Sequence, residues 1–197
     1  MSVAVPTAGV RAVLADTLPR SAVRDVAMVV GAALLTAAAS RLVIPLGFSP
    51  ASITGATFAV LVTGAALGPF RGAAGQALYV ALGAFGLPFF TGGGSGVAFL
   101  AGATGGYPVG FVLAAALVGW CARRGWDGTP WGTAAAFALG SAVIYLVGVP
   151  WLAAAGGFGL PEAVRLGLLP FLVGDALKAV LAAAVLPVAW RLAGDRP

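Results

Sequence analysis

The segment LGLLPFLVGDALKAVLAAAVLPVAW, residues 166–190, is apolar and long enough to cross a bilayer, yet an acid and a base interrupt it. Each charge costs roughly 2.5 to 3.5 kcal/mol at the centre of a membrane helix. Asp175 and Lys178 are three residues apart, so a helix places both on one face, where they partly neutralise each other. Because charged side chains inside a membrane commonly mark functional sites, this segment predicts a membrane-spanning fold that contains a polar site.

Composition extends this expectation to the whole chain. Of its 197 residues, 60% are hydrophobic and 9% are charged, whereas about 25% of the residues in a soluble domain are charged. One span takes about 20 residues, so the chain has room for about six spans and for no separate catalytic domain. The formal net charge is +5, but the basic residues are scattered rather than gathered in a stripe, so no nucleic-acid partner is expected.

Charges, prolines and glycines divide this apolar sequence into six predicted transmembrane helices. We expect them at about residues 22–43, 52–67, 71–85, 106–121, 133–151 and 163–192. The connection at residues 86–106 is rich in glycine, which disfavours a helix, so it is predicted as an irregular, partly buried loop between helices 3 and 4. The predicted fold is an all-α integral membrane protein, with a transmembrane substrate-binding domain at 22–193 and tails at 1–21 and 194–197.

The arginines predict the orientation, because cytoplasmic connections carry an excess of Lys and Arg. On one side of the predicted helices lie Arg11, Arg20, Arg24, Arg71, Arg123, Arg124, Arg191 and Arg196. The other side carries only Arg41 and Arg165. We therefore expect a multi-pass protein of the cell (cytoplasmic) membrane with both termini in the cytoplasm. Residues 1–19 lack the apolar stretch of a signal peptide, so the first span is expected to direct insertion.

Absent residue types exclude several activities. The chain has no histidine, which excludes imidazole proton relays and Ser-His or Cys-His nucleophiles. Its single lysine, Lys178, follows Leu177 rather than glycine, so a Walker A motif is absent and any ATP-driven step needs another subunit. The single cysteine, Cys121, cannot form an internal disulfide. We expect no enzymatic activity, no cofactor and no metal.

Three separated blocks carry a family resemblance. They are IPLGFSPASITGATFAVLVTGAALGPFRGAAGQALYVALGAFGLPFF (44–90), GGGSGVAFLAGATGGYPVGF (92–111) and LPFLVGDALKAVLAA (169–183). In order and in spacing they resemble the signature blocks of the BioY family, the biotin-binding S components of energy-coupling-factor (ECF) transporters. The resemblance covers about residues 22–193.

The resemblance implies a function that composition alone does not give. It predicts a six-helix membrane subunit that lies in lipid, captures biotin at its outer face and is not an enzyme. It also predicts a transmembrane coupling protein and two cytoplasmic ATPase subunits as partners, although some members of the family are found without dedicated partners. Biotin is then the transported ligand and not a cofactor.

The resemblance also implies which residues meet the ligand. Asp175 is expected to accept hydrogen bonds from the ureido N–H groups of biotin, and Lys178 to donate to the ureido carbonyl or pair with the carboxylate, in charge-assisted bonds. Which biotin group each residue contacts is left open. The other expected contacts are aromatic rings, hydroxyls and glycine N–H groups that can approach closely: Tyr79, Tyr107, Thr54, Thr57, Gly93, Gly94, Gly96, Gly105 and Gly106.

Two departures from the family pattern keep alternatives open. The chain reads SITGAT at 52–57 where the family usually reads PITLQT, so Ala56 replaces a glutamine that could bind the ligand; residues 102–107 read GATGGY rather than GPTGGY. An S component for another vitamin is therefore one alternative. The others are a proton-coupled secondary transporter that uses Asp175 and a purely structural assembly subunit.

Small residues in the first predicted span indicate a close helix contact. Ala33 and Ala37 are four residues apart, so they form a small ridge on one helix face. The resemblance implies that this ridge docks on the coupling protein. Packing within the monomer would use the same ridge.

Overall fold

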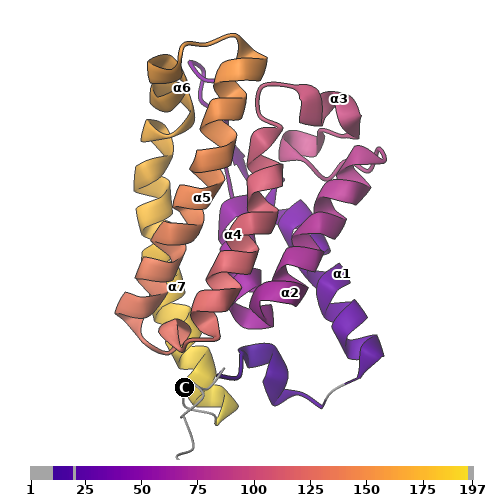
Figure 1. Ribbon diagram of the computed structural model, residues 1–197, viewed down its shortest axis with the longest axis vertical. Coiled ribbons are helices and arrows are strands. Elements are labelled where there is room, and N and C mark those ends of the chain that lie inside the picture. Colours follow the sequence, from indigo (N-terminus) through magenta and orange to yellow (C-terminus); the bar gives the residue numbers. More distant parts are fainter. Residues whose placement is uncertain (1–10, 20, 195–197) are drawn as a thin grey trace, which may run out of the picture.

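The computed structural model describes residues 11–19 and 21–194, which form a helical bundle with one short β-hairpin (Figure 1). In chain order the elements, with η for a 3-10 helix, are η1 (Leu14–Thr17), α1 (Ala22–Ala39), β1 (Val43–Ile44), β2 (Ile53–Thr54), α2 (Ala56–Ala84), η2 (Thr91–Gly93), α3 (Gly96–Ala101), α4 (Gly106–Ala122), η3 (Trp126–Gly128), α5 (Pro130–Gly156), α6 (Leu160–Gly167), η4 (Leu169–Phe171) and α7 (Leu172–Ala193). The two strands pair antiparallel, with Val43 opposite Thr54.

The apolar helices agree with the predicted membrane class. Within the described residues, four helical stretches are long and apolar enough to cross a membrane. They are Ala22–Ala39, Ala56–Ala84, Pro130–Gly156 and Leu160–Ala193, of which the last joins α6 to α7. Helix α4 is apolar but shorter.

Helix α2 is a hairpin of two helices rather than one long rod. Gly68 has φ +82° and ψ 178°, a non-helical conformation that glycine adopts without strain, and Pro69 follows it. The chain reverses there: a Cβ placed on Gly72 would lie only 2.9 Å from Cα of Gly64, whereas eight residues of straight helix span about 12 Å. Gln76 Nε2 donates to Thr63 Oγ1 across the hairpin at 3.1 Å. The two halves, 56–67 and 69–84, correspond to the second and third predicted spans.

Glycine lets the neighbouring helices approach these halves closely. A Cβ on Gly75 would lie 2.7 Å from Cβ of Ala32 in α1, and a Cβ on Gly64 would lie 2.7 Å from the carbonyl oxygen of Ala115 in α4. Ala33 and Ala37 are also buried in this core, at 0% and 7% exposure. The small residues of α1 therefore pack within the monomer, and their docking on a coupling protein stays a prediction.

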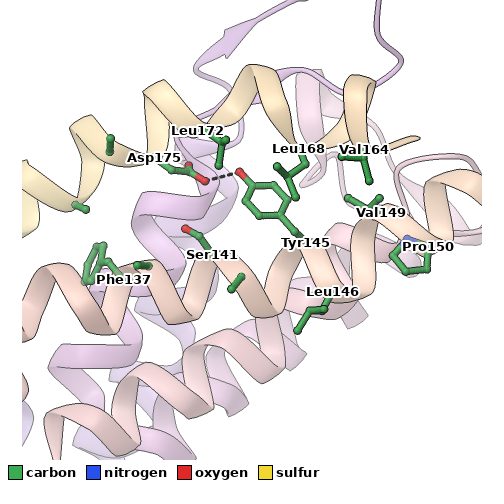
Figure 2. Close-up of a pocket in the computed structure, with 14 residues that line it drawn as sticks. Phe137, Ser141, Tyr145, Leu146, Val149, Pro150, Val164, Leu168, Leu172 and Asp175 are labelled. Carbon is green, nitrogen blue, oxygen red and sulfur yellow. Dashed lines mark hydrogen bonds between the residues drawn. The ribbon is translucent and has the colours of Figure 1, made fainter. Parts of the chain in front are cut away.

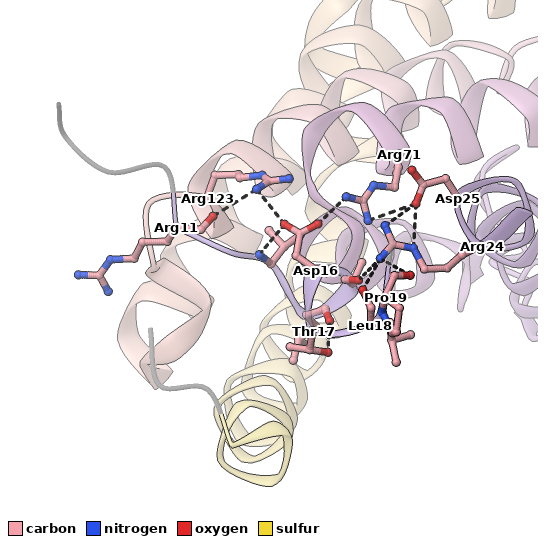
Figure 3. Close-up of polar contacts among 12 residues, drawn as sticks. Arg11, Asp16, Thr17, Leu18, Pro19, Arg24, Asp25, Arg71 and Arg123 are labelled. Atoms are coloured by element: carbon pink, nitrogen blue, oxygen red, sulfur yellow. Dashed lines mark hydrogen bonds and ion pairs between the residues drawn. The ribbon is translucent and has the colours of Figure 1, made fainter. Parts of the chain in front are cut away.

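The bundle has two ends of different character. Arg11, Arg24, Arg71 and Arg123 gather with η1 at the lower end in Figure 1, here called the arginine-rich end (Figure 3). The connections that include η2, α3 and α6 lie at the upper end, here called the loop end. This arrangement groups these four arginines as the sequence predicts; Arg20 and Arg196 lie outside the described residues.

The glycine-rich connection at the loop end is more ordered than predicted. It contains η2 and the short helix α3, so only part of residues 86–106 is irregular. Gly92, Gly93 and Gly96 have φ values of +65°, +91° and +84°, which side chains other than glycine rarely adopt. Glycine in this segment therefore permits tight turns around a short helix.

The last predicted span is divided in two. Helix α6 ends at Gly167, η4 contains Pro170, and α7 begins at Leu172. Proline removes a backbone donor and clashes with the preceding helical turn, which explains why a single helix over 163–192 does not form. The consequence is that α7 begins only three residues before Asp175 and presents its first turns to the site.

A buried carboxylate organises the arginine-rich end (Figure 3). Asp16 receives Arg71 Nη2 at 2.5 Å and Arg123 Nη1 at 2.9 Å, and its side chain is 6% exposed. Burial raises the pKa of Asp16, but the hydrogen bonds from Arg71 and the Val13 N–H, with the charges of the two arginines, outweigh burial and hold the pKa below its usual value. Part of the predicted N-terminal tail thus packs on the bundle; residues 1–10 and 195–197 lie outside the described residues.

A second buried carboxylate joins η3 to α7. Asp127 is 3% exposed and accepts a hydrogen bond of 2.7 Å from Trp190 Nε1, while its Oδ1 has no partner among the described residues. Burial raises the pKa of Asp127 to about 6, although the Trp190 hydrogen bond opposes the shift. The sequence places this residue in a connection and does not predict its burial.

We expect Asp127→Asn to stabilise the protein above pH 6. The folded-state pKa is above the unfolded value, so proton binding favours the folded state, and wild-type stability falls as the pH rises from about 4 to about 6. Asparagine removes this step while keeping an acceptor for Trp190. Thermal midpoints measured from pH 4 to 8 should therefore be similar for the two proteins near pH 4 and higher for the variant above pH 6. Parallel curves would show that Asp127 does not titrate in this range.

Candidate functional site

A cavity of about 330 Å³ lies toward the loop end, where residues of α2, η2, α3, α4, α5, η4 and α7 meet the β-hairpin. Its volume is within the range of roughly 300 to 1,000 Å³ that is usual for small-molecule sites. The lining residues are Val43, Pro50, Ala51, Ser52, Thr54, Thr57, Tyr79, Thr91, Gly92, Phe99, Thr104, Tyr107, Pro108, Phe111, Ile144, Tyr145, Phe171 and Lys178. Aromatic rings and hydroxyls dominate, and Lys178 supplies the charge.

The aromatic walls are fixed by contacts behind them. Tyr79 is 1% exposed, its hydroxyl lies 3.0 Å from Ser40 Oγ, and its ring packs edge-on against Phe90 at 5.7 Å between centroids. Tyr107 donates from its hydroxyl to the carbonyl of Gly167 at 2.8 Å, which ties α4 to the end of α6. Because both hydroxyls already have partners, these residues offer ring surfaces to the cavity. Such surfaces suit a flat, weakly polar ring system.

Lys178 reaches the cavity from α7. Its Nζ donates to Thr57 Oγ1 at 2.6 Å and to Asp175 Oδ1 at 3.2 Å, and its side chain is 16% exposed. An ammonium group has three donors. Two are used by these contacts, so one remains for a ligand acceptor.

Asp175 lies behind Lys178, on the side of α5. Its Oδ2 accepts a short hydrogen bond from the Tyr145 hydroxyl (Figure 2). Its Oδ1 accepts a hydrogen bond from Lys178. The carboxylate does not line the cavity; it lines a separate groove of about 640 Å³ between α5 and α7. The two oxygens are thus held by one cation and one phenol, which offsets much of the cost of burying a carboxylate.

The groove itself is almost entirely apolar. Figure 2 shows Tyr145 between α5 and α7, with Ser141 and Asp175 as its polar neighbours. The lining residues are Phe137, Ala138, Ser141, Ala142, Tyr145, Leu146, Val149, Pro150, Val164, Leu168, Leu172, Asp175, Ala176 and Ala179. Leu146 is 74% exposed and Leu172 is 48% exposed, so the groove opens on the exterior of the bundle.

The structure brings together many of the predicted site residues. Lys178, Tyr79, Tyr107, Thr54 and Thr57 all line the cavity, although they come from segments more than 100 residues apart. Asp175 touches this set through Lys178. Which of them contact the ligand stays a prediction.

The predicted glycines lie beside the cavity rather than on its lining. A Cβ on Gly93 would meet the Arg41 guanidinium, one on Gly94 the ring of Phe99, and one on Gly106 the side chain of Trp151. A Cβ on Gly105 would overlap the carbonyl of Leu100, and Gly96 needs its positive φ. Packing and backbone conformation therefore account for these glycines, while Gly92, next to them, does line the cavity.

Sequence reasoning missed the contributions of α5 and η4. Tyr145 and Phe171 line the cavity, with ring centroids 6.4 Å apart, and Ile144 lies beside them. The only available signal was a tyrosine in the middle of the fifth predicted span, where a phenol needs a hydrogen-bond partner. Its partner, Asp175, is 30 residues away in sequence and was not identifiable without the fold.

The chain is similar in sequence to proteins of one known family. The BioY family model matches residues 11–195, nearly the whole chain. The chain belongs to the BioY family. A relative from Rhizobium etli, named biotin transporter BioY, is 36% identical over 147 residues, which cover 71% of this chain and 78% of the relative. A biotin transporter BioY from Thermotoga maritima is 37% identical over 145 residues, covering 72% and 81%.

A solved structure shares the fold of this chain. The crystal structure of the S-component for biotin from an ECF-type ABC transporter superposes with a TM-score of 0.75 at 24% sequence identity, and the match covers 90% of this chain and 96% of that one. The helical bundle therefore has the same fold as that S-component. Together with its apolar helices, this makes the chain a multi-pass membrane protein.

Proposed function

We propose that this BioY protein is the substrate-specific subunit of an ECF-type importer and that it captures biotin for uptake across the cytoplasmic membrane. Its relatives are named as biotin transporters. The observation that carries the proposal is the aromatic cavity with Lys178 at its wall and Asp175 directly behind it. It is a binding role and not an enzymatic one, and it needs no cofactor.

The chemistry of the cavity fits biotin. The ligand has a compact bicyclic ring, an apolar chain and two acceptor groups, the ureido carbonyl and the carboxylate. The rings of Tyr79, Phe111 and Phe171 offer apolar surface to the bicycle, and the free donor of Lys178 meets one of the two acceptors. Asp175 keeps Lys178 in place and can accept a ureido N–H if the ligand reaches past it.

Ala56, which replaces the family glutamine, contributes no side chain to the cavity. The residue is 2% exposed and is not among the lining residues of the cavity. Thr54, Thr57 and Thr91 supply hydroxyls to the lining of the cavity. We propose that these hydroxyls carry the polar contacts that the glutamine would have made.

We propose six membrane crossings, by α1, the two halves of α2, α4, α5 and α7. The reversal at Gly68 supplies the crossing that helix length alone does not reveal. The arginine-rich end then faces the cytoplasm, as an excess of basic residues favours. Both termini follow on that side, and the cavity opens toward the outer face.

The proposed partners are a transmembrane coupling protein and two cytoplasmic ATPase subunits. The chain has no Walker A motif, so the energy for release must come from elsewhere. The arginine-rich end, where connections between the helices are tied together by Asp16, is on the side that those subunits would meet. Docking through Ala33 and Ala37 would require rearrangement of α1, because both are buried against the core.

Equilibrium binding to the purified protein tests the ligand. We expect saturable binding of labelled biotin, displaced by unlabelled biotin and by desthiobiotin but not by thiamine. Displacement by thiamine instead of biotin would indicate an S component for another vitamin. If neither compound binds to folded protein, as judged by a cooperative thermal transition, the proposed role in biotin capture is wrong.

A further inference from the structure

Tyr145 forms the wall between the polar cavity and the apolar groove. Of the described residues that line either space, Tyr145 alone lines both. Its ring stands between α5 and α7, with the hydroxyl pointing to Asp175 (Figure 2). The two spaces are therefore separated at this point by one aromatic ring.

The ring is held firmly in this position. Tyr145 is 8% exposed, its hydroxyl donates to Asp175 Oδ2, and its ring contacts Phe171. Moving it would leave the mostly buried carboxylate of Asp175 with Lys178 as its remaining partner, and loss of a hydrogen bond to a buried acceptor is unfavourable. The hydrogen bond thus closes the wall and also fixes Asp175 behind Lys178.

We propose that Tyr145 is a specificity-determining residue that limits the size of the ligand by closing the cavity on the side of α5 and α7. This inference rests on the proposed binding of biotin. Without the ring, the cavity of about 330 Å³ joins the groove of about 640 Å³. The joined space admits ligands that carry an additional apolar substituent on the part that meets Lys178.

Binding of extended ligands to Tyr145 variants tests the proposal. Two probes are used because either the ureido group or the carboxylate of biotin can meet Lys178. They are biotin with a butyl group on a ureido nitrogen and biotin hexyl amide. For at least one probe, we expect Tyr145→Ala to lower the ratio of its Kd to that of biotin by about 10-fold or more, because the wild-type cavity is overpacked by the substituent. Tyr145→Phe, which keeps the ring, should keep the wild-type ratio while weakening biotin itself.

The control variant is Leu146→Ala, because Leu146 lines the groove but not the cavity. It should leave the ratio of Kd values to that of biotin unchanged for both probes. The proposal is wrong if Tyr145→Ala excludes both probes as strongly as the wild type does. It is equally wrong if Tyr145→Phe admits them as well as Tyr145→Ala does, because the hydroxyl rather than the ring would then set the limit.

A second measurement needs no biotin and separates this proposal from the proposed function. In a Cys121→Ala background, the substitution Thr54→Cys reports access to the cavity. N-pyrenylmaleimide dissolved in lipid vesicles should label this thiol at least about 10-fold faster when Tyr145→Ala is added, because a path from the lipid opens through the groove. A charged maleimide in water should show no such change. If N-pyrenylmaleimide labels the protein equally fast with and without Tyr145→Ala, Tyr145 does not separate the cavity from the groove. This conclusion holds whether or not the protein binds biotin.

Discussion

Replacing Lys178 with methionine should weaken biotin binding by about 100-fold or more. The substitution removes the charged donor that faces the cavity and leaves the Asp175 carboxylate to repel the acceptor of biotin, and removing one partner of a buried, charged hydrogen bond typically costs about 2 to 5 kcal/mol of binding free energy. Radioligand binding to the purified protein measures the effect. Asp175→Asn should lose less, about 10-fold, because asparagine still accepts from Lys178 or Tyr145.

Arg165→Gln is the matched control for the loss of one positive charge. Arg165 lies in α6 at the loop end, and its side chain is 72% exposed. The control should bind biotin like the wild type, since an exposed cation on the surface contributes little to a buried site. If Lys178→Met and Arg165→Gln bind biotin equally well, Lys178 belongs to a structural ion pair and not to the ligand site.

Gly64→Ala should destabilise the protein by about 2 kcal/mol or more, as overpacking of a tight core does. The new Cβ would lie 2.7 Å from the carbonyl oxygen of Ala115 and 2.9 Å from its Cα. These are backbone atoms of α4, which cannot rotate away as a flexible side chain would. The predicted result is a thermal midpoint lowered by several degrees, measured in detergent with biotin absent.

Gly31→Ala provides the control for adding a methyl group to a helix. Gly31 lies in α1, and apart from its chain neighbours and the adjacent backbone of its own helix no atom lies within 4 Å of the position its Cβ would take. Because alanine favours a helix over glycine by about 1 kcal/mol, this variant should be as stable as the wild type or more so. Equal destabilisation by both substitutions would contradict the close contact between the α2 hairpin and α4.

Local sequence patterns predicted the positions of the helices well, because hydrophobic length and helix-breaking residues are local properties. Gly68 and Pro69 separate the two halves of α2 where the sequence indicates a boundary. The last span was predicted too long because Pro170 was not treated as a break, although proline rarely continues a helix. The burial of Val13 in the core and the pairing of Asp16 with Arg71 and Arg123 depend on residues far away in sequence, so neither has a local signal.

In the candidate site, too, local sequence features predicted some residues, whereas contacts made only in the folded protein determine the rest. Asp175 and Lys178 were predicted from the cost of charges in a membrane, and Tyr79, Tyr107 and the threonines from the family resemblance. Which of the two charged groups faces the cavity depends on how α7 rotates against α5 and α2, and that rotation is set by Thr57 and Tyr145. Neither contact can be predicted from spacing within α7.

A structure with biotin bound tests the central claim most directly, through the distance from Lys178 Nζ to the nearest polar atom of biotin. We predict a hydrogen bond of about 2.7 to 3.0 Å to the ureido carbonyl or the carboxylate, with biotin in the aromatic cavity and Tyr145 still between it and the groove. Biotin bound elsewhere, with Lys178 contacting only Thr57 and Asp175, would contradict it.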